Sequence, residues 1–133
     1  MTEPHTTHIR IGQVAERTEL SIKTLRHYDE VGLVTPSART AGGFRLYTEQ
    51  DVARLLVIRR MKPLGFTLAE MAELLSALDA MESASGSSES ARAVVQQFHA
   101  RAEQSCSALR RQVEYAEELT DLLSRVAATT STP

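Results

Sequence analysis

The sequence predicts a mainly α-helical protein in which a small N-terminal domain is followed by one long C-terminal helix. Three observations predict this class. Hydrophobic residues make up 42% of the 133 residues but aromatic residues only 5%, which suits helices packed by aliphatic side chains. Four short segments before residue 79 have helical apolar spacing or helix-capping residues. From residue 91, apolar residues recur every three or four positions for about thirty residues.

The first structured segment predicted after the N-terminal tail is a pair of short helices joined by a tight turn. The first is predicted over residues 11–17 and the second over residues 22–30. Ser21 is a good N-cap for the second helix, and Gly32 supplies its C-terminal cap. Two short helices with a tight turn between them form the helix-turn-helix pattern.

A β-hairpin is predicted directly after this helix pair. Residues 33–36 and 44–47 are short extended segments that flank a turn at Gly42 and Gly43. Glycine suits such a turn because it accepts positive φ without a clash from Cβ. A hairpin in this position forms a wing beside the helix-turn-helix.

Two further helices are predicted from their capping residues. Thr48 and Thr67 are each followed three positions later by an acidic residue, which is the pattern of a capping box. The third helix is expected to end near Met61, because Pro63 disfavours helix in the residue before it. The fourth carries apolar residues as far as Leu78.

The long C-terminal stripe of apolar residues requires a packing partner. Roughly 35 helical residues extend on the order of 50 Å, which is longer than a domain of this size is wide. A helix folded back on its own domain would therefore leave part of the stripe in water, and a second copy of the chain is favoured. The residues predicted to form the dimer contact are Phe98, Ala102, Cys106, Leu109, Val113, Ala116, Leu119 and Leu123.

Charge is segregated along the chain, although the whole chain has a net charge of only −2. Residues 21–62 hold eight basic and four acidic residues, a net charge of +4, whereas residues 79–133 hold five basic and eight acidic residues, a net charge of −3. The positive part is where phosphate contacts are expected. Chance alone can also produce such a window, so charge does not decide the function.

Six short segments of the chain occur in a characteristic order and spacing. They are IGQVA at 11–15, TLRHYD at 24–29, GLVTP at 32–36, Arg39, GFRLY at 43–47 and LGFT at 64–67. Together these segments resemble the MerR family of bacterial transcription regulators. The resemblance covers residues 9–78, and the C-terminal half resembles the family only in having a linker and a long helix.

This resemblance implies a fold and a function. The fold is a winged helix-turn-helix, a second helix pair that acts as another wing, and an antiparallel coiled coil between two copies. The function is binding of double-stranded DNA at a palindromic promoter operator, with distortion of that DNA to control transcription by RNA polymerase. We accordingly expect a tail at residues 1–8, a DNA-binding domain at 9–78, a linker at 79–90, a dimerisation helix at 91–126 and a tail at 127–133, both tails disordered.

The resemblance and the charge pattern select the residues expected at DNA. The second helix, at residues 22–30, is the recognition helix, and the alternative for its charged residues is a solvated face. For His27 the alternative is incidental exposure, and for Phe44 it is packing in the core. Tyr28 can combine packing with a phosphate contact through its hydroxyl. The expected DNA-binding residues are Lys23, Thr24, Arg26, His27, Tyr28, Arg39, Phe44, Arg45, Tyr47, Arg59 and Lys62.

Cys106 is the sole cysteine, and it is interpreted as a small hydrophobic residue in the dimer contact. A metal site needs two or more soft ligands, and His99 lies about 10.5 Å away on the same helix, so no metal site is predicted within one chain. A site between subunits and a redox role stay open as alternatives, and so does weak metal binding by His5 and His8.

No enzyme, cofactor or membrane span is predicted. The sequence has no phosphate-binding glycine loop, no nucleophile elbow and no HExxH pair. The single cysteine and the absence of an apolar leader favour a cytoplasmic protein. Two alternatives stay open: a module that senses a small molecule or a partner, with a pocket formed by the coiled coil and linker around Met81, Phe98 and Tyr115, and a DNA-architectural protein without an effector. A small-molecule or redox effector of the regulator stays open as well.

Overall fold

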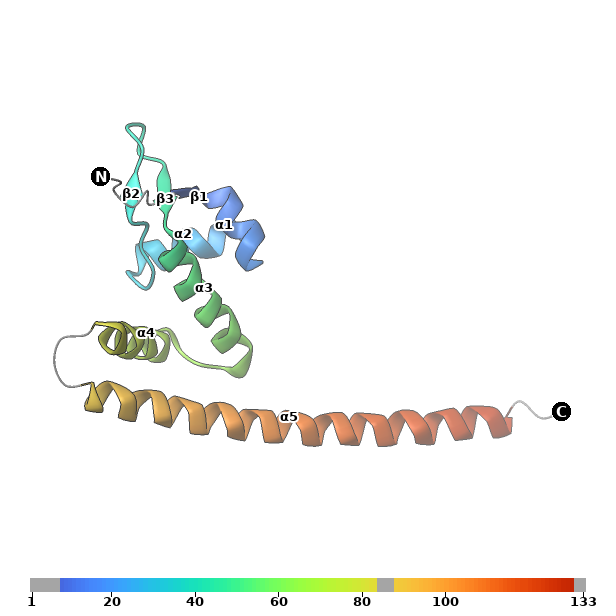
Figure 1. Cartoon of the computed structure of the whole chain (residues 1–133). Helices are drawn as coiled ribbons and strands as arrows, with labels where there is room; N and C mark the ends of the chain where they lie inside the picture. Colours follow the sequence, from blue (N-terminus) through green and yellow to red (C-terminus); the bar gives the residue numbers. More distant parts are fainter. Residues whose placement is uncertain (1–7, 84–87, 131–133) are drawn as a thin grey trace, which may run out of the picture.

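The computed structural model describes residues 8–83 and 88–130, and it is mainly helical (Figure 1). A compact domain of four α-helices and a small sheet is followed by the long helix α5 (Glu89–Thr130), which runs past the domain. This arrangement confirms the predicted fold class. The two predicted tails and the linker lie partly outside the described residues, at 1–7, 84–87 and 131–133.

Helices α1 (Ile11–Thr18) and α2 (Ile22–Glu30) form the helix-turn-helix. The turn depends on Glu19, which has a left-handed backbone with φ of 59°. The Ser21 hydroxyl then accepts a hydrogen bond from the backbone N–H of Thr24 at 3.0 Å, which caps α2 as predicted.

The wing is a three-stranded antiparallel sheet in the order β1-β3-β2, formed by Ile9–Arg10, Arg45–Tyr47 and Ala38–Arg39. The prediction of a strand at 33–36 was wrong. Leu33 and Val34 are both buried in the core, and a strand would have sent two successive side chains to opposite faces. β1 was not predicted, because a two-residue strand has too little periodicity to be read from sequence.

The second helix pair is α3 (Glu49–Met61) and α4 (Leu68–Glu82), joined by the 3₁₀ turn η1 (Lys62–Leu64). Both predicted capping boxes are present, at Thr48 with Asp51 and at Thr67 with Glu70. α4 continues to Glu82, four residues beyond its predicted end. The added residues, 79–82, include Ala80, Met81 and Glu82, which are good helix formers, whereas the Ser-rich composition of residues 79–90 as a whole predicted a linker.

The core of the domain lies between the helix-turn-helix, the sheet and the second helix pair. Its members are aliphatic residues with Tyr28, Tyr47 and Phe98, and Thr18 is fully buried among them. The hydroxyl of Thr18 donates to the carbonyl of Val14 at 2.7 Å, so this buried polar group is satisfied. The largest fully buried side chains are those of Tyr47, Leu25, Leu55, Ile58, Leu75, Val14 and Val52.

Helix α5 divides into two parts that differ in burial. Its first part packs against α4, where Ala91 and Phe98 are buried and the Phe98 ring lies 5.6 Å from that of Phe66. The prediction that Phe98 belongs to the dimer contact was therefore wrong, because it completes the core of its own domain. From residue 106 to residue 129 every residue is exposed. The helix also continues to Thr130, so residues 127–130 are not the disordered tail that was predicted.

No helix within the described residues is long and apolar enough to cross a membrane.

An ion pair and a ring contact fix α5 on α4. Arg101 donates to the Glu70 carboxylate at 2.6 Å, and its guanidinium lies 4.5 Å from the centre of the Phe66 ring. The hydrogen bond from Arg101 is the main reason that the pKa of Glu70 lies below its ordinary value. A carboxylate with a lowered pKa stabilises the fold above its ordinary pKa of 4.5, and this contribution is lost as the pH falls through the lowered value.

We expect Arg101→Met to lower the midpoint of thermal unfolding by on the order of a few degrees at neutral pH. The difference from the wild type should shrink well below pH 4.5, where protonated Glu70 no longer attracts Arg101, leaving the part due to the ring contact. Thermal unfolding followed by circular dichroism at several pH values measures this. Arg92→Met is the control, since Arg92 is exposed on the same helix. A pH-independent difference would contradict the role of the ion pair.

Candidate nucleic-acid interface

Helix α2 presents a buried face to the core and a polar face to solvent. Leu25 and Tyr28 are buried, whereas Lys23, Arg26 and His27 are exposed. The hydroxyl of Thr24, which is half-buried, accepts a hydrogen bond from that of Ser21 at 2.8 Å. The helical spacing thus separates packing residues from the side chains that are available to a ligand.

A hollow of about 760 Å³ lies between α2, the start of α1 and the tip of the wing. Three cations and one carboxylate contribute to its lining, so its charge favours an anion. α1 also begins here without a side-chain cap, so the N–H groups of its first turn remain for another acceptor. The lining residues are Arg10, Ile11, Gly12, Gln13, Glu16, Arg26, Gly43, Phe44 and Arg45.

A second hollow, of about 570 Å³, lies on the other side of α2, against η1 and the start of α4. It combines cations at Lys23 and Lys62 with an apolar lining. The recognition helix is therefore flanked by two hollows, one toward each wing. The lining residues of the second are Lys23, Thr24, His27, Tyr28, Lys62, Phe66, Leu68 and Met71.

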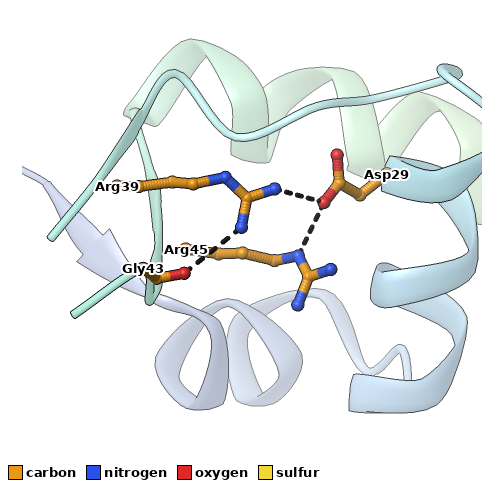
Figure 2. A network of polar contacts seen from close by, with 4 residues as sticks. All are labelled: Asp29, Arg39, Gly43 and Arg45. Carbon is orange, nitrogen blue, oxygen red and sulfur yellow. Dashed lines mark hydrogen bonds and ion pairs between the residues drawn. The ribbon is translucent and has the colours of Figure 1, made fainter.

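One carboxylate joins the recognition helix to the wing (Figure 2). A single oxygen of Asp29, Oδ2, accepts from Arg45 Nε at 2.6 Å and from Arg39 at 2.9 Å. Arg39 also donates to the carbonyl of Gly43 at 3.3 Å, so it contacts the turn of its own hairpin. The hydrogen bond to Asp29 is the main cause that raises the pKa of Arg45, so this guanidinium stays protonated.

The structure brings most of the predicted DNA-binding residues to these two hollows. The exceptions are Arg39, Tyr47 and Arg59. Tyr47 is fully buried, and burial raises the pKa of its hydroxyl, so in this conformation it is a core residue and is not placed to contact DNA. Arg59 contacts the end of α1, through the carbonyl of Thr18 at 3.3 Å and Glu19 at 3.2 Å. Arg39 lies in the Asp29 network.

Tyr28 fits both of the roles considered for it. It is 3% exposed, which shows the packing role, and it still contributes to the lining of the second hollow. Burial also raises the pKa of its hydroxyl, which therefore remains a hydrogen-bond donor at neutral pH. Phe44 is 67% exposed at the wing, so core packing does not account for it.

Sequence reasoning missed Arg10 and underestimated Asp29. Arg10 lies in β1 and reaches the first hollow only because β1 pairs with β3, where Arg10 faces Leu46. A cation just before the first helix was the one signal for it. Asp29 was not among the residues expected at DNA, and its partners Arg39 and Arg45 are brought to it by the hairpin.

The remaining dimer residues lie on the exposed part of α5 or at its border. Ala102 is half-buried, and Cys106 is exposed. Leu109, Val113 and Leu119 are 48%, 54% and 54% exposed. Ala116 and Leu123 are exposed too. A long helix with this many exposed apolar side chains is unusual for a helix that remains alone in water.

No group of three or more His, Cys, Asp and Glu side chains within the described residues is arranged to hold a metal ion. His5 lies outside the described residues. The pocket around Met81, Phe98 and Tyr115, which belongs to the alternative of a sensing module, does not form within one chain. Phe98 is in the core, and Tyr115 is 17 positions further along the same helix, about 25 Å away.

A helix-turn-helix with a wing and two cationic hollows beside its second helix defines the class of DNA-binding proteins. Comparisons with known proteins agree. A family model described as MerR HTH family regulatory protein matches residues 9–78, and one described as MerR, DNA binding matches residues 52–125. The chain therefore belongs to the MerR family of transcription regulators and contains its DNA-binding domain. Several of its curated relatives are named as transcriptional regulators, in agreement with the expectation that the chain is not an enzyme.

Individual relatives show how far the likeness extends. The mercuric resistance operon regulatory protein of Bacillus cereus is 43% identical over 70 residues, which are 53% of each chain. The chain thus matches about half the length of the first curated relatives. PbrR691 from Ralstonia metallidurans CH34, solved with lead(II), is 33% identical with a TM-score of 0.54, covering 87% of this chain and 86% of its own.

A further structural neighbour shares the fold over almost the whole chain. HiNmlR, a MerR family regulator lacking the sensor domain, was solved bound to promoter DNA. It is 20% identical with a TM-score of 0.75, and the match covers 94% of this chain and 97% of the other. At this identity the likeness concerns the fold alone, and it includes the long C-terminal helix.

Proposed function

We propose that the chain acts as a homodimer that binds a palindromic promoter operator and distorts it to control transcription by RNA polymerase. The observation that carries this proposal is the arrangement of α2 between two cationic hollows. Donors on both sides of a recognition helix can contact the phosphates that border the major groove, while Arg26 and its neighbours reach the groove itself.

The dimer supplies the symmetry of the operator. The exposed apolar residues of α5 suit a second copy of the same helix, and two domains joined in this way would contact two half-sites related by a two-fold axis. One structural neighbour, HiNmlR, was solved bound to promoter DNA, which supports this function.

Distortion of the DNA follows from the two wings of each domain. Contacts beyond the groove that holds the recognition helix are made only if the duplex bends toward them, and the added contacts offset the cost of bending, on the order of 1–6 kcal/mol. A bent and untwisted operator would bring two promoter elements with an overlong spacer into a spacing that RNA polymerase can use.

One relative is a mercuric resistance regulator and another was solved with lead(II). The residues of this chain do not fit a sensor of such soft metals. Soft metals need thiolate ligands, and the chain has one cysteine, Cys106, which is exposed on α5. We therefore propose that Cys106 packs in the dimer contact.

Genome-wide mapping of bound sites, followed by transcription in vitro on the mapped promoters, tests the proposal. The expected sites are palindromes between promoter elements, and the protein should change transcription from such a promoter by about tenfold or more, the size of a moderate coupling energy. Shortening the spacer toward the usual length should remove this dependence. Sites without two-fold symmetry, or bound promoters whose transcription ignores the protein, would contradict the proposal and favour an architectural role.

A further inference from the structure

We infer that Asp29 is a positioning residue that determines specificity: it holds the two wing arginines in place and so restricts which DNA the wing can contact. This inference rests on the proposed function, because it concerns the same DNA-binding surface. Asp29 itself is a carboxylate, and a carboxylate beside phosphate groups is unfavourable unless it acts through the cations around it.

The wing places two positively charged side chains next to each other. Arg39 and Arg45 face each other directly across the β2–β3 pair. Two like charges in this cross-strand position destabilise a hairpin. Asp29 removes the repulsion, since its Oδ2 lies within 2.9 Å of one guanidinium and 2.6 Å of the other (Figure 2).

The position of Asp29 makes this contact rigid. Its side chain is 11% exposed, and it projects from the last turn of α2, where the helix is fixed to the core by Leu25 and Tyr28. The Arg45 side chain is 23% exposed, so it is held between the recognition helix and the wing. The orientation of the wing is thereby tied to that of the recognition helix.

The contact between Asp29 and Arg45 leaves the terminal nitrogens of the Arg45 guanidinium available to phosphate. Asp29 accepts from Nε of Arg45, and within the described residues both terminal nitrogens of that guanidinium have no hydrogen-bond partner. These nitrogens can donate to phosphate oxygens. The cluster of two arginines and one carboxylate also has a net charge of +1 instead of +2.

These features act on specificity in two ways. Mobile arginines can reach the phosphates of any duplex, whereas fixed ones fit only a backbone that has the shape of the operator complex. The carboxylate also lowers the general attraction to DNA, which is electrostatic and independent of sequence. Asp29 should therefore strengthen operator binding and weaken non-specific binding at the same time.

The variant Asp29→Asn tests the inference, with Glu30→Gln as the matched control. Glu30 is the next residue, is exposed, and its substitution makes the same change of charge. The probes are the duplex that the wild type selects from a random library and a scrambled duplex of equal composition. For Asp29→Asn we expect roughly a tenfold loss of affinity for the selected duplex, the size of one charge-assisted hydrogen bond, with equal or higher affinity for the scrambled one. Glu30→Gln should keep the ratio of the two affinities.

A second measurement separates positioning from folding. In the background of Arg39→Ala the cross-strand repulsion is gone, so Asp29→Asn should cost less than half as much affinity there, a coupling that a double-mutant cycle measures. Unfolding midpoints of all variants identify any loss due to misfolding. If Asp29→Asn lowers both affinities equally, or if Glu30→Gln matches it, Asp29 is not a specificity residue. A wild-type chain that selects no duplex would instead overturn the proposed function.

Discussion

Val113→Glu should convert the protein from a dimer to a monomer at micromolar concentration. Val113 is 54% exposed on the part of α5 in which every residue is exposed, and it lies between Leu109 and Ala116 on the predicted dimer face. Full burial of a Val or Leu side chain contributes about 1.5–3 kcal/mol, whereas a buried, unpaired carboxylate costs several kcal/mol. In a two-fold dimer the substitution is present twice. Light scattering or sedimentation would measure the mass.

Val113→Glu should weaken binding of the whole operator far more than binding of a single half-site. Joining two domains makes binding of the second half-site intramolecular, which raises affinity by about 10²–10⁴ over that of one domain. We therefore expect Val113→Glu to lower operator affinity at least a hundredfold. Binding of a single half-site should be nearly unchanged, since Val113 is remote from both hollows.

The structure also selects the control and a second variant. Ser107 lies two positions from Leu109, about 200° around the helix, so Ser107→Glu should leave the dimer intact. A chain ending at Ser105 should be a folded monomer, because it keeps Ala91, Phe98 and Arg101 on the domain. Truncation at Ser90 would instead expose the core. If the intact protein is itself a monomer, the dimer interpretation is wrong.

Arg26→Ala should weaken binding of the selected operator by about 1–3 kcal/mol per half-site. Arg26 is exposed on α2 and contributes to the first hollow, and no hydrogen bond or ion pair engages its guanidinium within the described residues. Its donors are therefore available to a guanine edge or to a phosphate. In a dimer the loss occurs at both half-sites, so the total should reach about 2–6 kcal/mol.

A salt titration separates the two targets of Arg26. Loss of a phosphate contact lowers affinity for operator and scrambled DNA alike and flattens the salt dependence by about one unit per contact. Loss of a base contact relaxes the preference at one symmetric base pair instead. We expect a mixed result in which affinity falls more than preference. Arg60→Ala is the control, because Arg60 is exposed on α3 and lines neither hollow. Wild-type binding by Arg26→Ala at every salt concentration would show that the interface is misplaced.

Local signals in the sequence determined most of the secondary structure. Ser21, Thr48 and Thr67 cap their helices as predicted, since a side chain that accepts from a backbone N–H acts within four residues. Helical spacing also placed Leu25 and Tyr28 inward and Arg26 outward. The family motifs identified the protein as a MerR regulator.

The tertiary structure decided what each side chain does once distant segments meet. Tyr47 is a core residue because the sheet turns it inward, and Phe98 belongs to its own domain because α4 packs on the first part of α5. The sequence by itself determined an apolar stripe and a set of wing cations. Only the fold separated the covered part of that stripe from the exposed part, and only the fold brought Asp29 to Arg39 and Arg45. The reason is that helical periodicity and capping are local, whereas burial and ion pairing depend on contacts between residues far apart in the chain.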